Sequence, residues 1–176
     1  MQYLRYFCFT ECVNLMQFST NTTYLYRYLA SSSPITSVDF KAKANNDVHI
    51  ALSAGPQDKP ALYEVVIGGW SNTKSVIRRA KQSQQKVEAS TPGILSPNEF
   101  RGFWITYNFG VIKVGKEGHA PFMEWTDPNP LPVNNIGYST HMGSNGEFVF
   151  CLDDPTAGKC FNSLQYVKRA LIKVCS

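Results

Sequence analysis

No stretch of the 176-residue sequence holds the roughly 18 consecutive apolar residues that a membrane-spanning helix needs. Internal repeats and low-complexity segments are lacking too. The chain instead has 43% hydrophobic and 13% aromatic residues, a composition too apolar for a disordered protein. We therefore expect a single domain, which at this length can bury a substantial core.

The sequence also has little net charge. Its 17 basic and 13 acidic residues leave a formal charge of +4, and three of the basic residues, Lys168, Arg169 and Lys173, lie near the C-terminus. A nucleic-acid-binding domain usually carries a basic face on its body. We interpret the three residues as a solvated basic tail and expect no nucleic-acid partner.

Cysteine is scarce, with five residues at positions 8, 12, 151, 160 and 175, and the odd number excludes a fully paired disulfide framework. Cys8 and Cys12 lack the second pair of ligands that a zinc knuckle needs. Cys151 and Cys160 could pair in an oxidising compartment, but we favour reduced cysteines. A cytoplasmic location is therefore favoured, and the alternative is a place within a larger secreted protein.

The N-terminal residues resemble a signal peptide only in part. Glu11 and Asn14 interrupt the apolar run, and no clear small-residue cleavage site follows. We treat residues 1–17 as an N-terminal extension. Asn21-Thr22-Thr23 fits the acceptor triplet for N-linked glycosylation, a pattern that also arises by chance.

Strand patterns dominate the rest of the chain. Residues 37–44 alternate apolar and polar side chains, which is typical of a half-buried strand, and Asn45-Asn46-Asp47 then supplies turn-forming side chains. Similar signals recur about every ten residues. They predict further strands at residues 23–29, 48–53, 62–67, 74–79, 86–89, 101–107, 111–114, 122–125, 136–140 and 147–151. Residues 71–89 lack proline and glycine and could instead form a helix capped by Ser71, but their apolar residues do not form a good helical stripe. Many short strands joined by turns indicate an all-β protein, an antiparallel, jelly-roll-like β-sandwich.

The predicted domain division follows from this pattern. The sandwich is expected over residues 18–151, and residues 152–176 form a basic tail. Within that tail, residues 162–174 place Leu164, Val167, Leu171 and Val174 on one face of a short predicted helix.

The sequence offers no demonstrable catalytic constellation. His49 lies within an apolar strand and is interpreted as a packed residue, while His119 and His141 lack partners at metal-ligand spacing. No G-x-S-x-G motif is present. Gly68-Gly69 is followed by Trp70 and not by the glycine pattern that opens a helix at a nucleotide-like cofactor. We therefore assign no catalytic residue, no metal and no evident cofactor.

The most conspicuous polar cluster lies between Tyr63 and Arg79, around the double glycine. Its residues could line a polar pocket with an aromatic floor, or the glycines could only permit a bend. In a strand, Arg78 and Arg79 point to opposite faces, so one of them needs a buried carboxylate partner, and we predict a Glu64–Arg78 pair beside Trp70. The predicted ligand-binding residues are Glu64, Trp70, Asn72, Arg78, Arg79 and Trp104.

The same segment, YEVVIGGWSNTKSVIRR at residues 63–79, resembles the hallmark of the farnesoic acid O-methyltransferase-like domain family. The resemblance extends upstream through residues 40–44 and 49–53. Downstream it continues through residues 103–105, 112–115, 125–128 and 146–150. It covers roughly residues 18 to 151.

The family name implies methylation of farnesoic acid to methyl farnesoate in arthropod juvenile hormone synthesis, with S-adenosylmethionine as cofactor. The family's domain also resembles an accessory module of larger extracellular and innate-immunity proteins. The sequence favours the second reading, a non-catalytic module that binds a small ligand, a glycan or a protein, because a cofactor-binding βαβ unit is missing. The alternatives are an S-adenosylmethionine-dependent methyltransferase with farnesoic acid as substrate and a purely structural interaction module.

Overall fold

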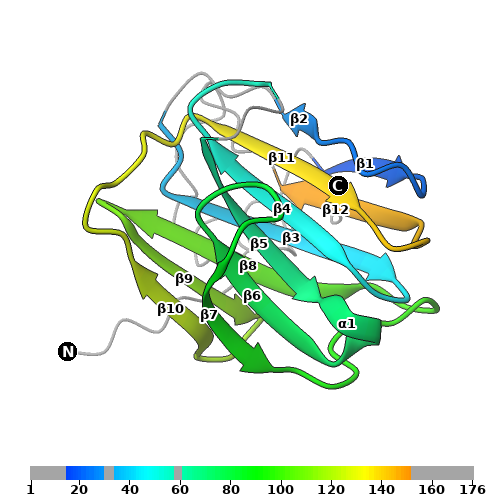
Figure 1. Ribbon diagram of the computed structural model, residues 1–176. Helices are drawn as coiled ribbons and strands as arrows, with labels where there is room; N and C mark the ends of the chain where they lie inside the picture. The colour runs from blue at the N-terminus through cyan, green and yellow to red at the C-terminus, as the bar shows by residue number, and fades with distance from the viewer. Residues whose placement is uncertain (1–14, 30–33, 58–60, 152–176) are drawn as a thin grey trace, which may run out of the picture.

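The computed structural model describes residues 15–29, 34–57 and 61–151, which form two six-stranded antiparallel sheets packed face to face (Figure 1). Sheet A has the order β1 (Leu15–Thr20), β12 (Gly146–Cys151), β3 (Ser37–Ala44), β8 (Arg101–Asn108), β9 (Val111–Lys116), β10 (Pro121–Thr126). Sheet B has the order β2 (Arg27–Leu29), β11 (Asn135–Thr140), β4 (Val48–Ser53), β5 (Leu62–Gly68), β6 (Lys74–Arg78), β7 (Gln85–Ser90). The predicted all-β antiparallel sandwich is confirmed.

The core lies between the sheets and follows the alternation of each strand. Sheet A contributes Phe40, Phe103 and Phe150, and sheet B contributes Ile50 and Val65, all fully buried. Burying each such side chain contributes about 1.5–3 kcal/mol. Because successive residues of a strand point to opposite faces, the intervening residues of sheet B must face outward.

Most of the predicted strands lie within two residues of their expected bounds, and two regions differ. The predicted strand at residues 23–29 is reduced to β2, because Tyr24 and Tyr26 fold over the outer face of sheet B and do not extend the ladder. Strand β1 was not predicted, and it pairs with β12 at the edge of sheet A. The helix predicted at residues 162–174 lies outside the described residues.

One end of the sandwich carries three adjacent turns. The β3–β4 turn is joined to the β5–β6 connection by a hydrogen bond from the Asp47 amide to the Gly68 carbonyl (2.9 Å). The β11–β12 turn joins it through the His141 amide, which donates to the Asp47 carbonyl (3.3 Å). The short element α1 (Gly69–Asn72) lies at this end, and the β8–β9 turn lies at the opposite end (Figure 1).

Two further findings concern Cys151 and membrane-spanning helices. Cys151, the last residue of β12, is disulfide-bonded, so the expectation of reduced cysteines is wrong for this residue. Within the described ranges, no helix combines the length and the apolar character that crossing a bilayer requires.

Candidate ligand-binding site

The connection between β5 and β6 is a left-handed turn. Gly68, Trp70, Ser71 and Asn72 have φ angles of 62°, 51°, 59° and 61°. Each non-glycine residue in this conformation costs roughly 1–2 kcal/mol, and runs of such residues are rare. At Gly68 a Cβ atom would also lie 2.7 Å from both Asn72 Oδ1 and Leu95 Cδ1, so glycine is needed there for space as well as conformation.

The surrounding loops hold this strained turn in place. The Asn72 side chain donates to the Leu95 carbonyl (3.0 Å) and accepts from the Leu95 amide (3.1 Å). The Gly93 amide donates to the Asn72 carbonyl (2.8 Å), and the Thr73 hydroxyl donates to the Trp70 carbonyl (2.7 Å). Strained backbone of this kind persists only where neighbouring contacts enforce it, and it concentrates at functional sites.

The turn presents Trp70 on the outer face of sheet B. The indole lies beside two cations from β6, with Lys74 Nζ at 4.2 Å and Arg78 Cζ at 5.5 Å from the ring centroid. Even with these contacts, the side chain remains 43% exposed. A large aromatic surface is therefore fixed in orientation and open to solvent.

Beside Trp70, the outer face of sheet B contains a buried carboxylate, Glu64, with an exposed fraction of 0%. Arg78 on the neighbouring strand donates from Nη1 to Glu64 Oε2 (2.7 Å), as the register of β5 and β6 requires. The predicted Glu64–Arg78 pair is confirmed. The same carboxylate also accepts bonds from the Tyr24 hydroxyl, from the Tyr26 hydroxyl (2.9 Å) and from the Gln82 amide (2.9 Å).

The donors around Glu64 determine its charge. Burial alone would raise the pKa of the carboxyl group, but His49, Tyr24 and Arg78 stabilise the carboxylate and lower its pKa to about 2. Because its oxygens are already used by partners from the chain, Glu64 is a structural anion. It ties the β1–β2 loop and the β6–β7 loop to the outer face of sheet B.

His49 is the second buried polar residue of the cluster. It is 2% exposed, with Nδ1 3.7 Å from Glu64 Oε1 and Nε2 3.5 Å from Asp47 Oδ1. Burial alone would lower the pKa of the imidazole, but the two carboxylates outweigh burial and raise it. The interpretation of His49 as a packed residue is confirmed.

Side chains from the loops cover the cluster. The Tyr24 ring stacks on the His141 ring, with centroids 4.3 Å apart, and Lys81 Nζ lies 4.2 Å from the Tyr24 centroid. The Gln82 side-chain nitrogen lies 3.3 Å from His141 Nε2. Polar groups of the β6–β7 loop and the β11–β12 turn thus lie beside the Trp70 surface on one face of the domain.

The position of His49 predicts a pH dependence. Its folded-state pKa is raised, so its charged form stabilises the fold fully below the unfolded-state value of 6.5, and this stabilisation is lost as pH rises through the folded-state pKa. We expect the stability difference between wild type and His49→Gln to be larger at pH 6 than at pH 9. Urea denaturation of both proteins at each pH measures this difference, and the subtraction removes the contribution of titrating groups that do not interact with His49. An equal difference at both pH values would contradict the charged His49.

The structure separates the predicted site residues. Glu64, Trp70 and Arg78 come together on the outer face of sheet B, and Asn72 holds the turn. Arg79 points away from them, bonds to the Asp127 carboxylate and to the Asn129 carbonyl, and lies 5.2 Å from the Tyr63 ring centroid.

Trp104 lies on the outer face of sheet A and so on the opposite side of the sandwich from Trp70. Its indole nitrogen donates to the Lys116 carbonyl (2.9 Å), and its ring covers the backbone of Gly115. This arrangement is a packing contact that needs a residue without a side chain on the neighbouring strand.

Gly115→Ala is therefore expected to destabilise the domain, because the added Cβ would overlap the Trp104 ring. Overpacking of this kind costs about 1–3 kcal/mol. Chemical denaturation measures the loss. Gly93→Ala is the control for backbone strain. Its added Cβ would meet nothing within 4 Å, so only its φ of +65° is unfavourable.

Sequence reasoning missed the residues that cover the cluster, namely Tyr24, Tyr26, Lys81, Gln82 and His141. They lie in loops, where no periodicity reports which way a side chain points. One signal of a polar cluster on this face was available in the sequence. The alternation of β4 places His49 on the outward face, together with Ala51 and Ser53.

Comparison with known sequences identifies the family. The sequence profile of the farnesoic acid O-methyltransferase family matches residues 18–154. The chain belongs to this family. A BTB/POZ domain-containing protein of Arabidopsis thaliana is 33% identical over 129 residues, which is 64% of this chain but only 16% of that protein.

Solved structures share the fold at low sequence identity. A galectin of Caenorhabditis elegans has a TM-score of 0.52 and 13% identity, covering 78% of this chain and 96% of the galectin. A Bacillus subtilis protein of unknown function with a galectin-like fold has a TM-score of 0.55 and 8% identity, with coverage of 80% and 89%. The β-glucanase of Bacillus licheniformis has a TM-score of 0.51 and 14% identity, with coverage of 80% and 79%. These likenesses establish a galectin-like sandwich.

Proposed function

We propose that this farnesoic acid O-methyltransferase-family domain is a non-catalytic recognition module that binds a glycan on the outer face of sheet B, against Trp70. The observation that carries the proposal is the left-handed turn at residues 68–72, which bears a strain cost and keeps a tryptophan exposed. Strain without a packing benefit is expected at a ligand contact.

The chemistry around Trp70 suits a sugar. A sugar ring has an apolar face of C–H groups that packs on an aromatic ring, and hydroxyl groups that need fixed hydrogen-bonding partners at its edge. Lys74 and Arg78 flank the indole, and Gln82 and His141 lie on the neighbouring loops of the same face. A glycan ligand is in keeping with the names of two proteins of similar fold, a galectin and a β-glucanase.

The buried Glu64 cluster supports this role indirectly. A binding surface built on loops loses affinity when ligand binding must first order those loops. Glu64 already fixes the β1–β2 and β6–β7 loops with bonds from Tyr24, Tyr26 and Gln82. The surface is therefore pre-organised, and its carboxylate is not available to act as a catalytic acid or base.

A glycan array probed with wild type and with Trp70→Ala tests the proposal. Binding of the wild type to a defined set of glycans, with loss in the variant, is expected. If the ligand is a protein or a small molecule instead, the array will give no signal. Binding that depends on Trp70 will then be found in a pull-down or in a small-molecule screen.

The alternative is the S-adenosylmethionine-dependent methylation of farnesoic acid that the family name describes. Gly68-Gly69 leads into the left-handed turn and then into β6, so no helix N-terminus follows it to receive a cofactor. Calorimetry with S-adenosylmethionine separates the two functions. Micromolar affinity for S-adenosylmethionine would overturn the proposal, and an absence of heat is the expected result.

A further inference from the structure

We propose that Asn21 is an acceptor for N-linked glycosylation and that the first N-acetylglucosamine unit rests in a hollow beside Leu25 and Arg27. The proposal does not depend on the ligand-binding function. Asn21-Thr22-Thr23 lies in the loop between β1 and β2, and all three residues are exposed.

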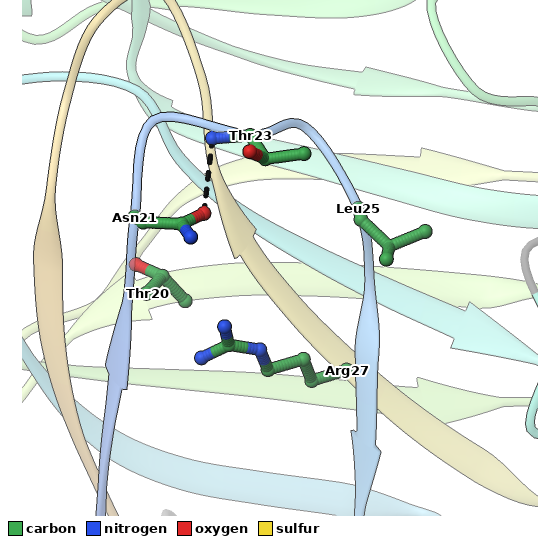
Figure 2. A pocket seen from close by; sticks show the side chains of 5 residues that line it. All are labelled: Thr20, Asn21, Thr23, Leu25 and Arg27. Carbon is green, nitrogen blue, oxygen red and sulfur yellow. Dashed lines mark hydrogen bonds between the residues drawn. The ribbon is translucent and has the colours of Figure 1, made fainter.

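The loop conformation leaves the reactive atom accessible. Asn21 Oδ1 accepts a hydrogen bond from the Thr23 amide (3.1 Å), which fixes the orientation of the side-chain amide (Figure 2). The nitrogen Nδ2 points into the space between the two arms of the loop (Figure 2). Over the described ranges, no hydrogen bond from this nitrogen is found.

A hollow of about 120 Å³ lies directly beside the acceptor, lined by Thr20, Asn21, Thr23, Leu25 and Arg27 (Figure 2). Leu25 is 56% exposed there and forms an apolar wall of the hollow. The Arg27 guanidinium reaches across the loop and donates to the Ser19 carbonyl. An apolar wall and a fixed cation suit the acetamido methyl group and the hydroxyl groups of a first sugar unit.

The disulfide at Cys151 is an independent observation on the compartment. Disulfides form and persist in oxidising environments, including the lumen of the endoplasmic reticulum, where N-linked glycans are attached. Together the acceptor triplet and the disulfide favour the secreted location over the cytoplasmic one.

The modification is a transfer from a lipid-diphosphate-linked oligosaccharide. Asn21 Nδ2 forms a bond to the anomeric carbon of the first sugar, and the bond between that carbon and the diphosphate oxygen breaks. The lipid diphosphate leaves with the bonding electron pair, and the amide nitrogen loses one proton. No oxidant or reductant is involved.

The test is translation of the full chain, fused to a cleavable secretory leader, in the presence of endoplasmic-reticulum microsomes. Protection from added protease identifies the molecules that entered the lumen, and only these are scored. We expect wild type to carry one glycan that peptide-N-glycosidase F removes. We also expect Asn21→Gln and Thr23→Ala to lack this glycan entirely, and Thr23→Ser to retain it.

Asn98→Gln, at an exposed asparagine outside any acceptor triplet, is the matched control and should be glycosylated as wild type is. A protected wild-type chain with no enzyme-sensitive mass shift would overturn the proposal. So would the same shift in Asn21→Gln. Because the readout is mass, loss of folding in a variant does not obscure the result.

Discussion

Glu64→Gln is expected to destabilise the domain by about 3–5 kcal/mol, the usual cost of removing one partner of a buried ion pair. The carboxylate accepts bonds on both oxygens, from Tyr26 on one side and from Arg78 and Gln82 on the other. Glutamine has no negative charge, so Arg78 loses its anionic partner even if the remaining side-chain oxygen still accepts from Arg78 and Gln82. For a chain of this length the loss corresponds to a fall in melting temperature of roughly 6–20 °C.

Thermal unfolding at pH 7 measures this effect, with Glu124→Gln as the matched control. Glu124 forms an ion pair with Lys113 (3.1 Å), but both side chains are about half exposed. A surface pair of this kind contributes only about 0–1 kcal/mol. If Glu64→Gln unfolded at the wild-type temperature and instead abolished ligand binding, Glu64 would be a ligand-binding group and the structural assignment would be wrong.

Substitutions at Trp70 should lower ligand affinity. Among the variants, glycine at this position should be more stable than alanine. Interface residues of this kind typically contribute 2 kcal/mol or more, so Trp70→Ala is expected to weaken binding by about 30-fold or more. In regular structure glycine is less stable than alanine by roughly 0.5–1 kcal/mol. At φ 51° the order reverses, and Trp70→Gly should be more stable than Trp70→Ala by about 1 kcal/mol.

Urea denaturation measures the stability order and titration with an array-selected glycan measures the affinity. Phe109→Ala is the matched control, because Phe109 is 90% exposed, has φ 46° and lies at the other end of the sandwich. Its affinity should stay within about twofold of wild type. If the Trp70→Gly variant were less stable than the Trp70→Ala variant, the turn would not be strained at Trp70.

The sequence specified the sandwich because strand alternation is a local signal. Residues 37–44 alternate without interruption, and the structure uses that alternation to fill the core with Phe40, Ala42 and Ala44. The Glu64–Arg78 pair was also predictable, since two adjacent strands of the hallmark segment bring these residues into register.

The rest of the site was not predictable from local patterns. Aromatic residues at 24 and 26 have high strand propensity, but tertiary bonds from their hydroxyl groups to Glu64 determine their place. The Trp70 turn was equally hidden, because a tryptophan, a serine and an asparagine in succession do not normally adopt positive φ angles. The position of Trp104 was also hidden, because only the sheet order places it on the opposite side of the sandwich from Trp70.

The three tryptophans provide the most direct test of the central claim that the ligand binds against Trp70. Trp70 lies on the outer face of sheet B, Trp104 on that of sheet A, and Trp125 on β10 with its ring 5.9 Å from that of Tyr63. Nuclear magnetic resonance of protein with ¹⁵N-labelled indole groups gives one indole N–H signal for each. During titration with the array-selected glycan, we expect the Trp70 signal to shift and the other two to stay in place. A shift of the Trp104 or Trp125 signal with an unmoved Trp70 signal would contradict the account.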